Sequence, residues 1–319
     1  MDPLSDVLSL LKPRSYAAGG FGAGAGVSIQ FPRHAGIKCY AIVSGQCWLC
    51  VEGVAEPVRL AMGDCFLLPS GRPFVLTSDL ALPPVDYRTV LRSQPRSVNA
   101  SVDDGADRFM VGGHFAFAGE HAGFLLGMLP PIVHIRKEAD KAVLRWSVER
   151  MTQELREPQP GGFLVVQHLA QMLLVQALRV CLAEGPKGGV GWLFALADKH
   201  MGAAITAMHE NPAHRWTLQE LAERAGMSRS TFALRFKDAV GSAPLEYLTR
   251  WRMLRAGDQL AGSNDPIGVV ALSAGYESES AFSTAFKRVM GCSPRQYGRS
   301  QPQPTWPADE LESAQPMAA

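Results

Sequence analysis

Two segments near the end of the chain repeat one another at an offset of fifty positions. The shared residues of the first segment are, in order, Ser228, Phe232, Phe236, Lys237, Gly241, Pro244 and Tyr247. Those of the second are Ser278, Phe282, Phe286, Lys287, Gly291, Pro294 and Tyr297. An Ala-x3-Gly pair precedes each set. Such a repeat indicates that the chain builds the same supersecondary unit twice.

The first repeat has the pattern of two short helices joined by a tight turn. Thr217 and Glu220 form the Thr-x-x-Glu pattern of a capping box, so we expect a helix to begin there. Gly226 stands where a left-handed residue ends that helix, and Ser228 is suited to cap the next one. In the second repeat the corresponding residues are Asp265 or Pro266 at the start, Gly275 at the turn and Ser278 at the second cap.

The two phenylalanines of each repeat stand four residues apart, so they share one buried helix face. The pattern predicts helix-turn-helix units at 217–240 and 266–290, joined by a helix from Pro244 to Leu260. Two such units at a fixed separation match adjacent major grooves, which recur about every 34 Å on one face of DNA. The repeat therefore favours a DNA-binding function over two helical hairpins that only pack a core.

The N-terminal part of the chain has a different pattern. From Val27 to about Thr89, short β-prone runs are separated by Gly, Pro, Asp or Ser, which is typical of a sandwich or barrel. A further such run covers 111–117. We expect a short helix before Pro13, a loop in the Gly/Ala-rich segment 15–25 and an exposed loop at 93–107.

Helical periodicity then appears at Ala142–Glu157 and Gly162–Ala183. The second segment is strongly apolar, but glutamines, a histidine and Arg179 interrupt it, which favours a packed helix over a membrane span. Because its apolar positions extend widely around the helix, we expect residues 138–183 to mediate dimerisation or packing.

The region from Trp192 to Arg299 resembles the DNA-binding domain of the AraC/XylS family of transcription activators. The segment 275–297, GYESESAFSTAFKRVMGCSPRQY, is very similar to that family's second unit. The resemblance implies recognition helices at 229–239 and 279–290. The base contacts that it implies fall on Arg229, Ser230, Ala233, Leu234, Glu279, Ser280, Ser283 and Thr284. Lys237, Lys287 and Arg288 are better suited to phosphates, which position the protein without specifying sequence.

Two positions depart from the family's habit, which places an arginine two residues before the phenylalanine of each Phe-Lys pair. Here those positions are Leu234 and Thr284. Arginine binds guanine through two hydrogen bonds, whereas leucine and threonine offer mainly a methyl contact to thymine. We therefore expect an operator with A·T pairs at these positions, or weaker and less specific binding.

The segment from Met62 to Phe74 resembles the second cupin motif, G-x5-P-x-G-x2-H. Gly63, Pro69 and Gly71 match, but Phe74 replaces the metal-binding histidine. The other metal ligands of a cupin come from earlier strands, and His34 is the sole histidine in that part of this sequence. The resemblance therefore implies a cupin barrel without a metal or other cofactor. Candidates for an effector pocket are His34, Tyr40, Trp48, Phe66 and Phe74, although ordinary core packing explains the aromatic residues equally simply.

Together these patterns predict an α+β protein of two domains: a cupin-like β-barrel with a helical extension, then an all-α double helix-turn-helix domain. The expected boundaries are 1–183 for the sensor domain, 184–191 for a linker, 192–299 for the DNA-binding domain and 300–319 for a disordered tail. Net charge is +1 for the whole chain, so charge alone does not indicate a nucleic-acid partner.

The functional prediction is a sequence-specific DNA-binding regulator, not an enzyme, that activates transcription under the control of an unknown small molecule or signal. Its expected partners are double-stranded DNA, RNA polymerase and a second copy of the chain. With no leader-like segment and no membrane span expected, the predicted location is the cytoplasm. The alternative is a metal-free or redox-responsive cupin, either a thiol sensor or an enzyme, with an accessory DNA-binding domain. For that alternative, Cys39, Cys47 and Cys65 lie on predicted strands and can cluster, although small packing residues explain them more simply.

Overall fold

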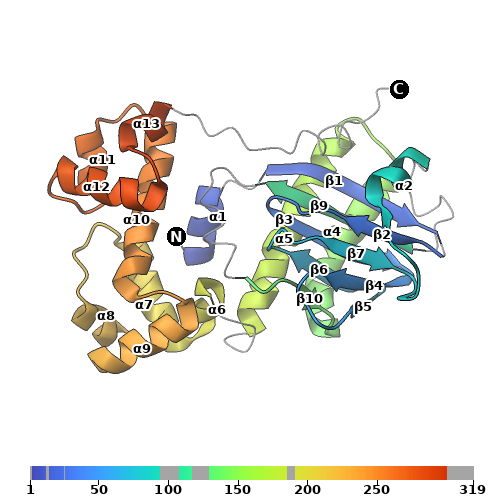
Figure 1. Cartoon of the computed structure of the whole chain (residues 1–319), viewed down its shortest axis with the longest axis horizontal. Helices are drawn as coiled ribbons and strands as arrows, with labels where there is room; N and C mark the ends of the chain where they lie inside the picture. Colours follow the sequence, from blue (N-terminus) through green and yellow to red (C-terminus); the bar gives the residue numbers. More distant parts are fainter. Residues whose placement is uncertain are drawn as a thin grey trace. The chain divides into compact units, whose positions relative to one another are not determined.

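The computed structural model describes residues 2–11, 14–24, 26–93, 108–116, 129–184 and 191–299. The chain forms two compact units. One contains the strands, from residues 13–116 and 130–181, and the other contains residues 1–12 and most of the C-terminal half, 182–305. Figure 1 shows the elements of both units.

The first unit is built from two five-stranded sheets. The first sheet is antiparallel and contains, in spatial order, β1 (Arg14–Ala23), β9 (Arg108–Ala116), β3 (Ile37–Ser44), β6 (Cys65–Leu68) and β10 (Val133–Ile135). The second contains β5 (Val58–Ala61), β4 (Gln46–Val51), β7 (Phe74–Thr77), β2 (Ser28–Phe31) and β8 (Val85–Asp86), with β2 and β8 parallel. The strands expected between Val27 and Thr89 are confirmed.

The barrel core follows from alternation along the strands. On β4, Cys47, Leu49 and Val51 are buried, while Trp48 and Cys50 between them are only half-buried. Buried side chains from both sheets form one cluster, whose members are Ile42, Cys47, Leu49, Val51, Leu60, Phe66, Leu68, Phe74, Leu76 and Met110. This shared core joins the two sheets.

The expectation of a loop at 15–25 is wrong, because β1 occupies most of that segment. β1 pairs with β9 along nearly its whole length, with one irregularity between Ser15 and Ala17. Its low side-chain content suggested a loop, but the sheet itself is crowded here. On β9, a Cβ atom at Gly112 would collide with the backbone of Cys39 and Tyr40. Glycine is therefore required by a close approach between strands.

Among the residues that the structure describes, the helices that accompany the sheets are α2 (Tyr87–Ser93), α4 (Glu138–Arg156) and α5 (Gly162–Glu184). α4 lies against β1, β9 and β3 (Figure 1). Asp64 anchors it, because one carboxylate oxygen lies 2.9 Å from Lys141 Nζ on α4 and the other lies 2.9 Å from His134 Nε2 on β10. Burial raises the pKa of Asp64, but the hydrogen bonds from Lys141, the Ala61 amide and His134 outweigh it and hold that pKa below its usual value.

By length and composition, Gly162–Ala183 of α5 is the kind of apolar helix that can cross a membrane. In the most apolar window of this helix, 44% is buried within the protein. This finding alone gives weak support for a membrane span.

The second compact unit, called the helical unit below, contains only helices among the residues that the structure describes. In chain order it contains α1 (Pro3–Leu11), α6 (Trp192–Ala197), α7 (Lys199–Glu210), α8 (Leu218–Arg224), α9 (Arg229–Val240), α10 (Pro244–Gly262), α11 (Ile267–Ser273), α12 (Glu279–Met290) and α13 (Pro294–Arg299). α10 runs between the α8–α9 pair and the α11–α13 group (Figure 1). The predicted connecting helix is thereby confirmed, with Pro244 at its first turn.

The N-terminal helix α1 packs within this second unit, although it precedes the barrel in sequence. It lies against α7 and α10, and its Leu4 and Val7 are buried. The Asp6 carboxylate lies 3.7 Å from Nδ1 of His209, whose ring stacks on Trp251 with 3.9 Å between centroids. The helical unit therefore includes a segment that sequence patterns assigned to the sensor domain. The predicted linker falls mostly on residues 185–190, and the predicted tail on 300–319, both outside the described residues.

Candidate nucleic-acid interface

The first helix-turn-helix unit consists of α8 and α9. Thr217 and Glu220 form the expected capping box at the start of α8. Gly226 has a φ of +64° in the turn, which an L side chain rarely adopts, and the Ser228 hydroxyl accepts a hydrogen bond from the Thr231 amide to cap α9. The local signals predicted from the sequence are thus confirmed at each of these positions.

The second unit, α11 and α12, repeats this frame with one change. Gly275 has a φ of +78°, and the Ser278 hydroxyl accepts from the Ala281 amide. Pro266 stands at the start of α11, where no side chain caps the helix. In both units the two phenylalanines of the recognition helix are completely buried; they are Phe232, Phe236, Phe282 and Phe286.

The loop between α7 and α8 contacts α10 and the second helix-turn-helix unit, and these contacts were not predicted from the sequence. Arg252 on α10 donates hydrogen bonds from Nε to the Pro212 carbonyl at 2.6 Å and from Nη2 to the His214 carbonyl at 2.7 Å. Arg215 forms an ion pair with Glu277 in the turn of the second unit. These contacts connect residues far apart in sequence, so no local pattern reveals them. They help to fix the separation of the two recognition helices.

The predicted DNA-contacting residues all lie on α9 and α12 and are accessible. Ala233 and Ser283 are half-buried, and the other nine are exposed: Arg229, Ser230, Leu234, Lys237, Glu279, Ser280, Thr284, Lys287 and Arg288. Leu234 is 64% exposed, so its methyl groups are open to solvent. The two helices therefore present mixed polar and apolar surfaces to solvent.

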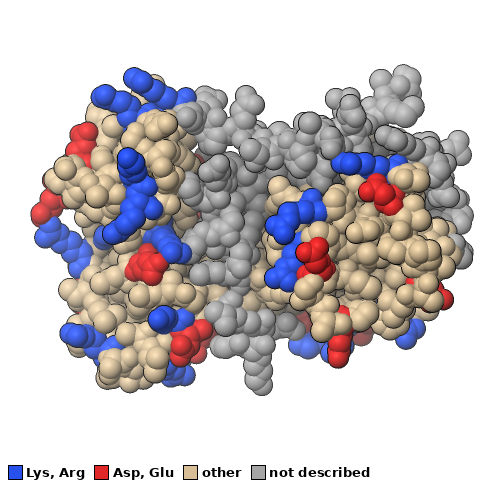
Figure 2. Space-filling model, in the orientation of Figure 1, with Lys and Arg blue, Asp and Glu red and all other residues tan. Residues whose placement is uncertain are grey.

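Among the described residues, charged side chains are spread over the helical unit that contains both helix-turn-helix units, with no single cluster on its visible face (Figure 2). Figure 2 shows basic side chains spread over its visible face, with acidic ones interspersed. Arg235 is exposed on α9, yet its charge acts on Asp198, where it helps the Met201 and His200 amides to lower the pKa against the effect of burial. Arg235 thus contributes to the frame as well as to the net charge of α9.

Comparison with known proteins agrees with this architecture. Residues 2–183 match a family model described as a cupin, and residues 221–300 match one described as a helix-turn-helix domain. The chain is 43% identical over 305 residues to an AraC-like transcription regulator of Streptomyces antibioticus, covering 95% of this chain and 100% of the relative. It is 42% identical over 308 residues to one from Streptomyces lividans, covering 96% and 100%.

The chain belongs to the AraC-like family of transcription regulators. It is a DNA-binding transcription regulator with an N-terminal cupin domain. Among solved structures, it matches the DNA-binding domain of the global transcriptional factor AdpA in complex with a target DNA, at 34% identity and a TM-score of 0.31. That match covers 32% of this chain and 92% of the other.

In this AraC-like regulator, the candidate effector residues lie at several places in the barrel. Phe66 and Phe74 belong to the core cluster, and Tyr40 packs against it. His34 is buried with its ring edge-on to Phe74, at 6.0 Å between centroids. Trp48 is half-buried between two inward-pointing residues of β4 and is not part of that cluster. The proposed pocket therefore stays a prediction.

A small cavity lies within the barrel, and none of the five candidate residues lines it. This cavity, of about 10 Å³, lies between Phe21, Ile29, Cys47, Leu76, Arg108 and Met110. That volume is at most enough for one water molecule. Among the described residues, no group of three His, Cys, Asp or Glu side chains is placed to hold a metal ion.

The predicted cluster of Cys39, Cys47 and Cys65 does not form, because Cys47 lies apart from the other two. Cys39 neighbours Cys65 and lies near Cys181 of α5, whereas Cys47 is on the other sheet and lines the small cavity. The hydrogen bond with Cys65 and complete burial raise the pKa of Cys39, and burial raises that of Cys47 to about 11. Both shifts favour the protonated thiol, which is the less reactive form.

Proposed function

We propose that this regulator binds its operator with both helix-turn-helix units, placing α9 in one major groove and α12 in the next on the same DNA face. The observation that carries the proposal is the matched construction of the two units. Each has a serine cap, a left-handed glycine and a buried phenylalanine pair, and each leaves a polar helix face exposed. Contacts of the loop at Pro212–Arg215 with α10 and with Glu277 support a defined separation of the two faces.

The proposed contact residues of each recognition helix fall into two groups, those that contact bases and those that contact phosphates. On α9, Arg229, Ser230, Ala233 and Leu234 are proposed to contact bases; on α12, Glu279, Ser280, Ser283 and Thr284 have that role. Lys237, Lys287 and Arg288 are proposed to contact phosphates. Since Leu234 and Thr284 present methyl groups, A·T pairs are expected at the positions they face.

The test is selection of binding sites from random DNA by the purified protein and by a Leu234→Arg variant. Arginine at this position is expected to change one base preference toward guanine in one of two boxes. Leu272→Arg is the matched control, because Leu272 is 65% exposed on α11, outside the recognition helices. The control should raise affinity for all sequences without changing base preference. An unchanged preference in the Leu234→Arg variant would contradict the assignment of α9.

We further propose that the cupin domain receives a small molecule or another signal and that the protein activates transcription through RNA polymerase, in the cytoplasm and without catalysing a reaction. Support comes from the fusion of a barrel to a DNA-binding unit in one chain. A thermal-shift screen of metabolites, followed by transcription in vitro with and without the hits, tests both parts. A hit that stabilises the protein but leaves transcription unchanged would argue against sensing.

A homodimer through α4 and α5 is the third part of the proposal. These helices expose large apolar side chains, which are Val143, Trp146, Phe163, Leu164, Val165 and Met172. Several exposed large apolar side chains on neighbouring elements of the sequence are compatible with an interface. Trp146→Lys with Leu164→Lys should yield monomers in analytical ultracentrifugation. The control is Leu80→Lys, since Leu80 is 50% exposed between β7 and β8, outside these helices. Binding of the unsubstituted protein to lipid vesicles would instead favour a membrane as the occupant.

A further inference from the structure

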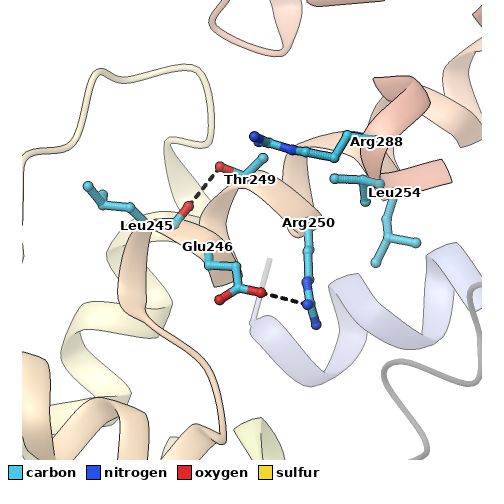
Figure 3. Close-up of a pocket in the computed structure, with 7 residues that line it drawn as sticks. Leu245, Glu246, Thr249, Arg250, Leu254 and Arg288 are labelled. Carbon is cyan, nitrogen blue, oxygen red and sulfur yellow. Dashed lines mark hydrogen bonds and ion pairs between the residues drawn. The ribbon is translucent and has the colours of Figure 1, made fainter. Parts of the chain in front are cut away.

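A cleft of about 640 Å³ opens on the helical unit between α10 and α12 (Figure 3). Its lining residues are Leu245, Glu246, Thr249, Arg250, Leu254, Arg288 and Val289. The volume lies in the range of ligand-binding clefts, and the lining combines aliphatic side chains with two guanidinium groups. None of the roles derived above requires this space.

The two arginines of the cleft differ in their pairing. Arg250 lies 2.6 Å from Glu246 on the same helix. Arg288 is exposed, and within the described part of the chain no carboxylate lies within ion-pair distance of it. In Figure 3, Arg288 extends from α12 above Thr249, with Leu245 and Leu254 to either side. A complementary occupant therefore carries carboxylates together with apolar side chains.

The last twenty residues of the chain have that composition. After Arg299 there is no lysine or arginine, whereas Asp309, Glu310 and Glu312 follow closely. Trp306 and Leu311 supply apolar side chains next to these carboxylates. The segment thus complements both the charge and the apolar lining of the cleft.

The segment follows α13 in the chain. α13 packs against α10 and α12, and position 298 lies beside the Leu260 carbonyl of α10. From Leu260, the cleft residues Leu254 and Leu245 are about 9 Å and about 22 Å away along the helix axis, at about 1.5 Å per residue. A stretch of seven residues, the length of 300–306, can span up to about 22 Å at about 3.1 Å per residue. Trp306 and the carboxylates after it can therefore reach the cleft.

We propose that the acidic C-terminal segment, residues 300–319, binds in the α10–α12 cleft and competes with DNA for Arg288. Because the segment is tethered, its effective concentration at the cleft is about 1 mM, so even a weak site is occupied in the free protein. Once the segment is bound, its carboxylates lie beside recognition helix α12 and oppose the approach of DNA phosphates. The segment then acts as an intramolecular competitor that a tight operator displaces and a weak site does not.

The first test uses no DNA, so its outcome is independent of the function proposed above. The receptor is the full-length chain with a neutral tail, carrying Asp309→Asn, Glu310→Gln and Glu312→Gln. A fluorescent peptide of residues 300–319 is titrated in, and its anisotropy is measured. We expect saturable binding with a Kd at or below about 1 mM, weakened by salt. Absence of saturable binding up to about 2 mM, twice the tethered concentration, overturns the proposal.

Two variants of the receptor locate the site. Arg288→Ala should weaken peptide binding about tenfold, as expected for loss of a charge-assisted hydrogen bond. Arg295→Ala is the matched control, because Arg295 is exposed on α13 and does not line the cleft, and it should leave the Kd unchanged. Equal loss in both variants, or equal binding of a scrambled peptide, would show general charge attraction and overturn docking in this cleft.

The second test measures the consequence for DNA. Against a DNA fragment of random sequence, the neutral-tail chain should bind between about twofold and about tenfold more tightly than the unsubstituted chain at low salt, since the competing state is removed. Trp306→Ala alone should give a smaller gain in the same direction. An unchanged DNA affinity in the neutral-tail chain would overturn the competition even if the peptide binds.

Discussion

The two helix-turn-helix units share their inward-facing residues and differ in their outward-facing ones. In both, the serine cap, the turn glycine and the buried phenylalanine pair recur in the same order. The first residue of the recognition helix, by contrast, is Arg229 in α9 and Glu279 in α12. The frame is fixed by packing, which tolerates few side chains, whereas the exposed face is free to differ. Similar folds with different faces allow the two units to bind different half-sites.

The two helix-turn-helix units also differ in the elements that pack against them. Loop residues Ala213 and Arg215 contact the turn of the second unit, at Gly275 and Glu277. The first unit instead rests on α7, where His209 is buried against Tyr247 and Trp251 of α10 and near α1. The first unit is therefore the one attached to α1, which two residues connect to β1 of the barrel.

The largest effect should come from the shared frame. Phe232→Ala and Phe282→Ala each remove a completely buried ring and should cost about 3–5 kcal/mol of unfolding free energy. Hydrogen exchange resolved by segment should show loss of protection first in the unit that carries the substitution. Equal loss in both units from either variant would show that they unfold together and would remove the basis for treating them as separable.

Acid should distinguish the two units through His209. Burial, with a smaller contribution from Arg255, lowers its pKa to about 3 from 6.5. The unfolded chain thus binds a proton that the folded chain does not, and stability falls as pH drops from about 6.5 toward 3, by up to about 1.4 kcal/mol per pH unit. Asp6 is the nearby carboxylate, at 3.7 Å, and burial raises its pKa.

The measurement is hydrogen exchange of α7 and α10 between pH 7.5 and pH 4.5, corrected for intrinsic rates. In the native chain, His209 Nε2 lies 2.8 Å from the Tyr247 hydroxyl. His209→Gln retains a group that can form a hydrogen bond with that hydroxyl but does not titrate, so the pH dependence of exchange should become flatter. The second unit should change less over this range. A pH dependence that persists unchanged in His209→Gln would assign it to another group.

The turn glycines should differ in their tolerance of alanine. Both have positive φ, so alanine at either site costs about 1–2 kcal/mol. At Gly226, however, an added Cβ meets nothing nearer than His200 Nδ1 at 3.9 Å, whereas at Gly275 it lies 2.5 Å from the Ala213 carbonyl oxygen. Gly275→Ala should therefore lower stability more than Gly226→Ala, and it should separate the loop from the second unit. Equal losses in chemical denaturation would show that the loop yields freely.

Sequence patterns predicted the helical unit well and the barrel less completely, for a physical reason. Caps, turn glycines and the phenylalanine spacing act within a few residues, so Thr217, Ser228 and Phe232 were assigned correctly from local patterns alone. The strand β1 was missed because its many glycines resemble a loop in the local sequence, and its pairing partner β9 is far away in the chain. The packing of α1 on α7 and α10, and the Cys39–Cys65 neighbourhood, depend likewise on long-range topology. Pocket residues are hardest, since alternation allows either face of a strand until the pairing is known.

The smallest expected effect concerns charge at the first residue of each recognition helix. Arg229→Ala removes a cation next to DNA, so the slope of log affinity against log salt should become shallower by about 0.9 if that side chain contacts a phosphate. If it contacts a base, as proposed, the slope changes less and one base preference relaxes instead.

Glu279→Gln removes an anion at the same position of α12 and should strengthen binding to all sequences slightly, unless its carboxylate accepts a hydrogen bond from a cytosine amino group. In that case affinity falls for operators with cytosine there and rises for others. Salt titrations of both variants on the selected operator and on a random fragment therefore separate base contact from general charge, one recognition helix at a time.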